Sequence, residues 1–130
     1  INGKFFHLNE AYVHVLTHSL HYAGAAWEGE RAYNGKIFKL EEHTNRLLKS
    51  AEYMGLTPLK YSTQEINAAT YELLEKNSLK DAYIRPLIWR GAESMGIYNS
   101  ELTVNILIAL LPSRSEFLNN LKLKSSNANS

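Results

Sequence analysis

Residues His18 to Leu40, HSLHYAGAAWEGERAYNGKIFKL, contain the clearest structural signal in the chain. Within them, Asn34-Gly35 separates two β-prone segments, residues 27–33 and 36–40. Asn-Gly supplies the two positive-φ positions that a two-residue type I′ turn requires, so the sequence predicts a tight hairpin. After the hairpin the apolar residues change to helical spacing, which predicts a strand, a turn, a second strand and a helix in that order.

Two segments carry the signals of α-helices. In residues 41–54 the apolar side chains recur at helical spacing, and Gly55 can adopt the left-handed conformation that ends many helices. Ser62 and Glu65 have the spacing of a capping box, which predicts the start of a second helix. We expect this second helix to end near Lys76 and to have a structural role.

Two later segments have the composition of β-strands. Residues 81–91 and 103–111 are rich in β-branched, aromatic and other apolar side chains, and we expect the second of them to be a central strand. Pro86 cannot donate a ladder hydrogen bond, so it predicts a bulge, a strand start or a sheet edge. Residues 115–124 suggest a helical turn and a further strand. Together the elements predict an α+β domain, an antiparallel-rich sheet with two main helices packed on it.

Length and composition limit the classes of protein. The 130 residues suggest one domain, which we assign to residues 1–124, with residues 125–130 as a frayed tail or the edge of a gap. A net charge of +1 without a long basic run argues against nucleic-acid binding. The absence of cysteine excludes a disulfide scaffold. No apolar stretch reaches the roughly 18–20 residues of a membrane span, so we expect a cytoplasmic protein with no membrane partner.

Three closely spaced histidines, His14, His18 and His21, raise the question of a metal site. Their spacing would align them only on a helix, and the β-branched and glycine-containing flanks argue against a long one. No carboxylate or cysteine completes a ligand set. We therefore predict no metal site and expect these side chains to form hydrogen bonds around a loop.

One face of the first predicted strand carries Trp27, Gly29 and Arg31, because side chains alternate along a strand. An aromatic ring, a bare backbone and a guanidinium can hold a flat ligand with a negative group. Arg46, in the following helix, can bind a phosphate in bidentate fashion. Arg85 lies in an apolar strand and should meet an anion or an acidic side chain. Solvated charges and a structural Arg–Glu pair are the alternatives that the residues alone leave open.

Several motifs follow one another in a defined order: Leu20-His21-Tyr22, Trp27-Glu28-Gly29-Glu30-Arg31-Ala32-Tyr33, Glu42-His43-Thr44-Asn45-Arg46-Leu47, Ser50-Ala51, Ala82-Tyr83-Ile84-Arg85-Pro86-Leu87-Ile88, Gly91 and Met95-Gly96. In these motifs the chain closely resembles the first domain of the branched-chain aminotransferases, which are fold-type IV pyridoxal-phosphate enzymes. The resemblance extends from about residue 1 to residue 111.

The resemblance implies transamination of leucine, isoleucine and valine with 2-oxoglutarate, with pyridoxal 5'-phosphate as cofactor. Arg46 matches the residue that binds the cofactor phosphate in this family. Five further residues match positions that contact the amino acid and 2-oxo acid substrates: Tyr22, Trp27, Arg31, Tyr83 and Arg85. The first three line the side-chain pocket, Tyr83 lies near the substrate α-carboxylate, and Arg85 meets the distal carboxylate of glutamate. We expect Arg31, Arg46 and Arg85 to border a common cavity.

The chain also departs from the family pattern. Trp27 stands where a phenylalanine is usual, so the sequence does not define the preferred amino acid, and Ala23-Gly24 replaces the commoner immediate glycine after Tyr22. The family's Schiff-base lysine and the acid opposite the pyridine nitrogen lie in a second domain. We expect both beyond Ser130, assign no catalytic residue within the chain, and predict that it supplies half of an active site and is inactive alone. The resemblance implies a homodimer or larger homo-oligomer, with Tyr83 and its neighbours facing the partner subunit.

Two alternatives remain at this point. A D-amino-acid aminotransferase or an aminodeoxychorismate lyase has the same fold, although the motifs are nearer to the branched-chain group. A non-catalytic assembly module would use its arginines in structural ion pairs. A phosphate or sulfate bound at Arg46 favours the enzyme, whereas internal carboxylates paired with both Arg46 and Arg85 favour the module.

Overall fold

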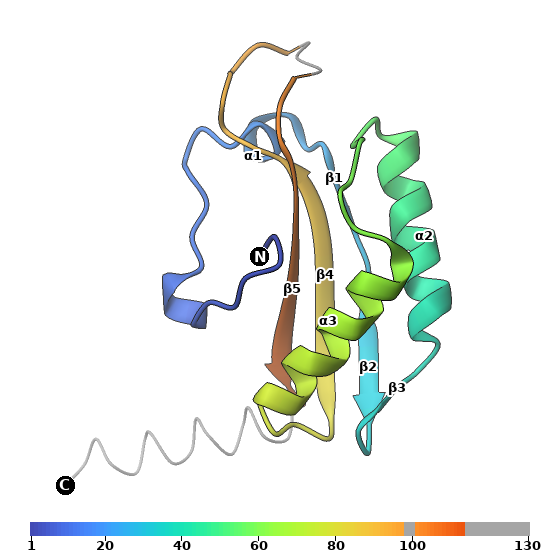
Figure 1. The fold of residues 1–130 in the computed structure, drawn as a ribbon. Helices are drawn as coiled ribbons and strands as arrows, with labels where there is room; N and C mark the ends of the chain where they lie inside the picture. Colours follow the sequence, from blue (N-terminus) through green and yellow to red (C-terminus); the bar gives the residue numbers. More distant parts are fainter. Residues whose placement is uncertain (98–100, 114–130) are drawn as a thin grey trace, which may run out of the picture.

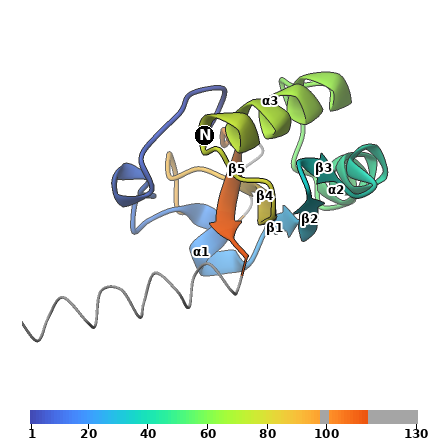
Figure 2. The same cartoon turned by 90° about the horizontal axis from the view of Figure 1, so that it is seen from below.

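The computed structural model describes residues 1–97 and 101–113, which form a five-stranded antiparallel sheet with two long helices on one face (Figures 1 and 2). The strands are β1 (Ala25–Trp27), β2 (Glu30–Tyr33), β3 (Lys36–Ile37), β4 (Ala82–Arg90) and β5 (Val104–Pro112). The helices are η1 (Leu8–Glu10), α1 (His18–Tyr22), α2 (Leu40–Tyr53) and α3 (Thr63–Lys76). The predicted α+β fold is confirmed. The predictions for residues 115–130 lie outside the described residues.

The predicted hairpin and both helix signals are confirmed. Asn34 and Gly35 have φ values of 48° and 77°, as a type I′ turn requires, and join β2 to β3. The backbone of Gly55 is left-handed just beyond α2, with φ of 67°. Ser62 and Glu65 form a complete capping box at the start of α3.

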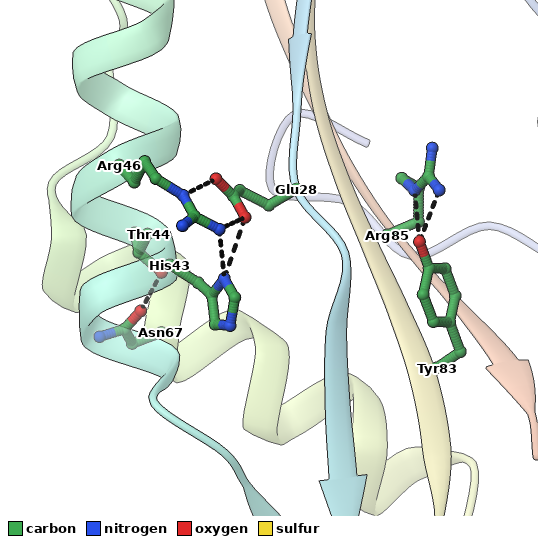
Figure 3. A network of polar contacts seen from close by, with 7 residues as sticks. All are labelled: Glu28, His43, Thr44, Arg46, Asn67, Tyr83 and Arg85. Atoms are coloured by element: carbon green, nitrogen blue, oxygen red, sulfur yellow. Dashed lines mark hydrogen bonds and ion pairs between the residues drawn. The ribbon is translucent and has the colours of Figure 1, made fainter.

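The two helices pack on one face of the sheet. A buried cluster joins the helices to the strands: Ala26, Leu47, Ala51, Leu56, Ile66, Ile88 and Ile106. A second cluster lies around the β2–β3 hairpin: Ala32, Ile37, Leu40, Leu74, Ala82 and Ile84. The helices are also joined directly, because the Thr44 hydroxyl on α2 donates a 2.6 Å hydrogen bond to Asn67 Oδ1 on α3 (Figure 3).

Strand β4 lies at the centre of the sheet, and its side chains alternate between the two faces. Four of its helix-facing residues are buried: Ala82, Ile84, Pro86 and Ile88. The residues between them lie on the opposite face, which we call the open face: Tyr83, Arg85, Leu87 and Trp89. Because β1 and β2 pair with β4, Trp27 and Arg31 also lie on the open face, while Glu28 and Glu30 point toward the helices.

Pro86 lies in the middle of β4, so the prediction of a bulge, a strand start or an edge at this residue was wrong. The sheet accommodates the proline by a gap in the neighbouring strand. β1 and β2 pair with β4 in one continuous register, and the gap between them, Glu28-Gly29, lies opposite Pro86. The Glu28 N–H donates to the Pro86 carbonyl at 3.1 Å, but the proline has no N–H to complete the pair. The missing donor therefore faces the gap and leaves the β4–β5 ladder intact.

The prediction that residues 103–111 form a central strand was also wrong. Within the described residues β5 pairs only with β4, along nine consecutive residue pairs. The outer edge of β5 is partly closed by Asn2, whose N–H donates to the Ile106 carbonyl and whose side-chain oxygen accepts from the Ile106 N–H, both at 2.9 Å. Apolar composition indicated a strand correctly but not its position in the sheet, and only Ile106 of β5 is buried.

Candidate functional site

The predicted phosphate anchor, Arg46, lies on α2 and is held by a carboxylate from the sheet. Its Nε and Nη2 atoms donate to the two oxygens of Glu28 at 2.5 and 2.6 Å, and His43 Nδ1 lies 2.9 Å from Glu28 Oε2 (Figure 3). Glu28 is buried, whereas 66% of the Arg46 side chain is exposed. The bidentate pair with Glu28 thus fixes the Arg46 guanidinium on the sheet, while most of the side chain remains exposed to solvent.

This pairing sets the charge of Glu28. Hydrogen bonding to Arg46 lowers the pKa of the Glu28 carboxyl below its ordinary value, against the opposing effect of burial, and His43 adds to the lowering. The carboxylate therefore stays ionised near neutral pH and keeps Arg46 in place. Arg46 Nη1 makes no hydrogen bond to the described part of the protein, which leaves a donor for an incoming anion.

A second group of polar side chains lies on the open face. Arg85 donates from Nε and Nη2 to the Tyr83 hydroxyl at 3.1 and 2.5 Å (Figure 3). The guanidinium carbon of Arg85 lies 4.0 Å from the centroid of a Trp27 ring, and that of Arg31 lies 5.9 Å from the Tyr83 ring. Two guanidinium groups are therefore held by neutral aromatic side chains. Neither arginine forms an ion pair within the residues that the structure describes.

Gly29 is required for this arrangement. A Cβ atom at this position would lie 2.7 Å from the Tyr83 hydroxyl oxygen and 3.4 Å from two of its ring carbons. The tyrosine ring therefore lies across the bare backbone of the gap between β1 and β2. We expected a ligand to approach this backbone, and the structure shows that the Tyr83 side chain does so.

The structure brings four of the six predicted site residues together and leaves two apart. Trp27, Arg31, Tyr83 and Arg85 form the open-face group. Arg46 lies on the helix-covered side of the sheet, so the expectation of one cavity bordered by three arginines is not met by the described residues. Tyr22 is on α1, and its hydroxyl donates to the Met95 carbonyl at 3.0 Å.

The two groups nevertheless meet at one edge of the sheet. β3 pairs only with Ala32 and Tyr33, so within the described residues β1 and the Glu28-Gly29 gap have no strand on their outer side. Trp27 and Glu28 are consecutive and point to opposite faces at this edge. A ligand placed across the edge can therefore reach Arg46 on one side and the open-face group on the other.

Three further residues of this region were not singled out as candidates from the sequence: Glu28, Glu30 and His43. Side-chain alternation did assign Glu28 and Glu30 to the face opposite Trp27. His43 and Arg46 are three residues apart and therefore lie on the same side of α2. Had that side of the helix been placed against Glu28 and Glu30, the sequence would have indicated a carboxylate partner for Arg46. The packing of α2 on the sheet was the missing information.

The expectation of hydrogen-bonded histidines is confirmed. His14 Nδ1 accepts from the Leu16 N–H at 3.1 Å, and His18 and His21 contact the carbonyls of Gly96 and Val15 at 3.1 and 2.9 Å. Within residues 1–97 and 101–113, no three His, Cys, Asp or Glu side chains are placed to hold a metal ion. No helix in those ranges has the length and apolar character to cross a membrane.

Comparisons with known proteins agree with the motifs. The family model described as Amino-transferase class IV matches residues 25–130. A probable branched-chain-amino-acid aminotransferase of Rickettsia bellii is 58% identical over 113 residues, covering 87% of this chain and 39% of the relative. The chain thus spans about two fifths of the length of the curated relatives it matches.

Solved structures give the same result. The branched-chain amino acid aminotransferase from Escherichia coli is 36% identical, with a TM-score of 0.80 over 85% of this chain and 39% of that one. The branched-chain aminotransferase from the thermophilic archaeon Thermoproteus uzoniensis, solved with norvaline, is 33% identical, with a TM-score of 0.79 and coverage of 85% and 39%. These findings confirm the resemblance seen in the sequence, and the chain belongs to the class IV aminotransferase family.

Proposed function

We propose that this chain supplies part of the active site of an enzyme that transaminates branched-chain amino acids with 2-oxoglutarate. The observation that carries the proposal is the pairing of two unlike groups at one sheet edge, an arginine fixed by Glu28 and two arginines held by aromatic rings. Relatives at 58% identity with that activity in their names support the choice of substrate class.

The residues at Arg46 fit the phosphate of pyridoxal 5'-phosphate. Arg46 is preorganised by two hydrogen bonds to Glu28, is largely exposed, and has an uncommitted Nη1 among the described residues. When bound, this cofactor stabilises negative charge at the substrate α-carbon. In our proposal Arg46 binds the phosphate, and Glu28 with His43 keeps the guanidinium oriented toward it.

The open-face group fits a substrate that is either aliphatic or acidic. The Trp27 ring offers apolar surface to a branched side chain. Arg85, held by the Tyr83 hydroxyl and the indole, offers a positive charge to the distal carboxylate of glutamate or 2-oxoglutarate. We propose that Tyr83 lies near the α-carboxylate, and that Tyr22 and Arg31 complete the side-chain pocket in the assembled enzyme.

The cofactor role of Arg46 is tested with the full-length protein that contains this chain. We expect Arg46→Ala to weaken pyridoxal-phosphate binding by about tenfold or more, since it removes a charge-assisted anchor. Lys49→Ala removes an exposed charge one turn further along α2 and should leave binding unchanged. Equal cofactor affinity of the wild type and Arg46→Ala contradicts the proposal.

The half-site proposal has its own test. The 130-residue chain alone, mixed with pyridoxal phosphate, leucine and 2-oxoglutarate, should form no glutamate, because we expect the reactive lysine beyond Ser130. The full-length protein should form it. Turnover by the short chain alone contradicts the half-site proposal, while the identity of the reaction is tested by the amino acids that the full-length protein accepts.

The alternative of a non-catalytic module is not favoured. That alternative expects internal carboxylates on both Arg46 and Arg85, and only Arg46 has one among the described residues. A homodimer or larger homo-oligomer and a cytoplasmic location remain proposals. Light scattering of the full-length protein tests the first, and fractionation of cells tests the second.

A further inference from the structure

Glu30 is a buried carboxyl group that the proposed reaction does not use. It lies on β2, faces the helices and is 2% exposed. Its Oε2 atom has no hydrogen-bond partner among the described residues. An unpaired carboxylate in such a place is unfavourable, so the group is expected to carry a proton more readily than an ordinary glutamate.

The surroundings of Glu30 are the same side chains that hold the phosphate anchor. Glu28 lies two residues before Glu30 along the chain and faces the same side of the sheet. His43, on α2, interacts electrostatically with Glu30. Arg46 stands one turn beyond His43 and is bound to Glu28. From β4 the directly paired residue is Ile84, which is fully buried and adds only apolar surface.

These neighbours act on Glu30 in opposite directions. Burial raises the pKa of Glu30 to about 7 as the largest cause, Glu28 raises it further, and His43 lowers it. Near neutral pH the cluster therefore exchanges a proton at Glu30. With Glu30 protonated, the two glutamates carry the single negative charge of Glu28, whereas with Glu30 ionised they carry two negative charges.

We propose that Glu30 is a positioning residue that acts through Glu28, His43 and Arg46 and makes binding of the cofactor phosphate dependent on proton uptake. The inference rests on the proposed function of Arg46. With Glu30 neutral, the guanidinium is available to a phosphate dianion. With Glu30 ionised, a second negative charge lies on the same face as Glu28 and opposes the approach of a phosphate dianion.

The sign of the effect follows from linkage. A bound phosphate dianion favours the protonated form of Glu30, so binding takes up a proton wherever the free protein has lost it. Affinity should therefore fall as the pH rises through about 7. One exchanged proton limits the change to about tenfold per pH unit.

The experiment uses full-length protein freed of cofactor, with pyridoxamine 5'-phosphate as a probe that cannot form a covalent bond to lysine. Calorimetry at pH 6, 7 and 8, in two buffers of different ionisation enthalpy, gives both the affinity and the protons taken up. Glu30→Gln removes the titration with little change of shape. Glu41→Gln alters an exposed carboxyl in the first turn of α2 and is the matched control.

We expect wild type and Glu41→Gln to lose about threefold to tenfold more affinity than Glu30→Gln between pH 6 and 8, and to take up more protons on binding near pH 7. Should Glu30→Gln fail to fold, Glu30→Leu also removes the titrating carboxyl group and replaces it in the same measurement. If the affinity of the wild type and of the Glu30 variant changes equally with pH, and both take up the same number of protons on binding, the role of Glu30 is overturned but the proposed function is not. Wild-type binding that is absent, or unchanged by Arg46→Ala, overturns the proposed function and this inference with it.

Discussion

The two faces of the sheet hold arginines in different ways. On the helix-covered face, Arg46 is bound by the ionised carboxylate of Glu28, and the charges balance. On the open face, Arg85 is held by the Tyr83 hydroxyl and the Trp27 ring, which orient the guanidinium without neutralising it. The first arrangement fixes a side chain, whereas the second leaves a positive charge that no carboxylate of the described residues neutralises.

The difference also teaches where each face should respond to change. The helix-covered face contains the titrating carboxyls, so pH should affect it. The open face depends on ring packing over a bare backbone, so steric and aromatic substitutions should affect it. Three stability measurements on the full-length protein test this separation.

The largest expected effect is the pH dependence due to Glu30. Because the pKa of this carboxyl is raised from 4.5 to about 7 in the folded state, ionisation opposes folding. Ionisation of Glu30 costs the protein nothing below pH 4.5. As the pH rises from there to about 7, the free energy of unfolding falls progressively, by at most about 3 kcal/mol. Glu30→Gln should remove this loss, as measured by denaturant unfolding at pH 5 and 8.

The control for that measurement is Glu41→Gln, which changes an exposed carboxyl and should retain the wild-type pH dependence. A Glu30→Gln protein whose stability changes with pH just as the wild type's does would show that Glu30 is not the titrating group. The proposed contrast in pH response between the two faces would then be lost.

An intermediate effect is expected from Gly29→Ala. The new Cβ atom would lie 2.7 Å from the Tyr83 hydroxyl, so the ring must move and its hydrogen bonds to Arg85 weaken. We expect a loss of about 1–2 kcal/mol in the free energy of unfolding. Gly24→Ala is the matched control, because no atom lies within 4 Å of its new Cβ, and it should be neutral or slightly stabilising.

The smallest effect is expected from Trp27→Leu. It removes the ring that lies 4.0 Å from the Arg85 guanidinium carbon and should cost about 0.5–1 kcal/mol, measured by chemical denaturation. Tyr33→Leu removes an aromatic of similar exposure from the same sheet and serves as the comparison. A larger loss in Tyr33→Leu than in Trp27→Leu would mean that the Trp27–Arg85 contact contributes nothing.

The sequence predicted the parts of the fold that depend on neighbours along the chain. Asn34-Gly35 defined a turn, Ser62 with Glu65 defined a helix start, and alternation placed Trp27 and Arg31 on one face. These signals act over two to four residues, so they can be read without knowledge of distant contacts.

The errors concern residues whose environment is set by tertiary pairing. Pro86 was expected at an irregular point of its own strand, but the irregularity lies in the partner strand, at Glu28-Gly29. Arg46 was predicted to bind an anion, but the sequence did not indicate its partner Glu28, because their contact depends on the packing of α2 on the sheet. Neither the strand order nor the helix position can be read from local spacing.

The proline in the central strand also protects the sheet against misalignment. If β1 and β2 slid along β4 by two residues, a carbonyl of β1 or β2 that is now paired would lie opposite Pro86 and find no N–H donor. The gap between β1 and β2 would then lie opposite another residue of β4 and leave its backbone N–H and carbonyl unpaired. Only one alignment places the gap opposite the proline. Pro86 therefore disfavours slippage at the position where Trp27 and Glu28 point to opposite faces of the sheet. In this way a proline that contacts no ligand helps to hold both arginine arrangements in place.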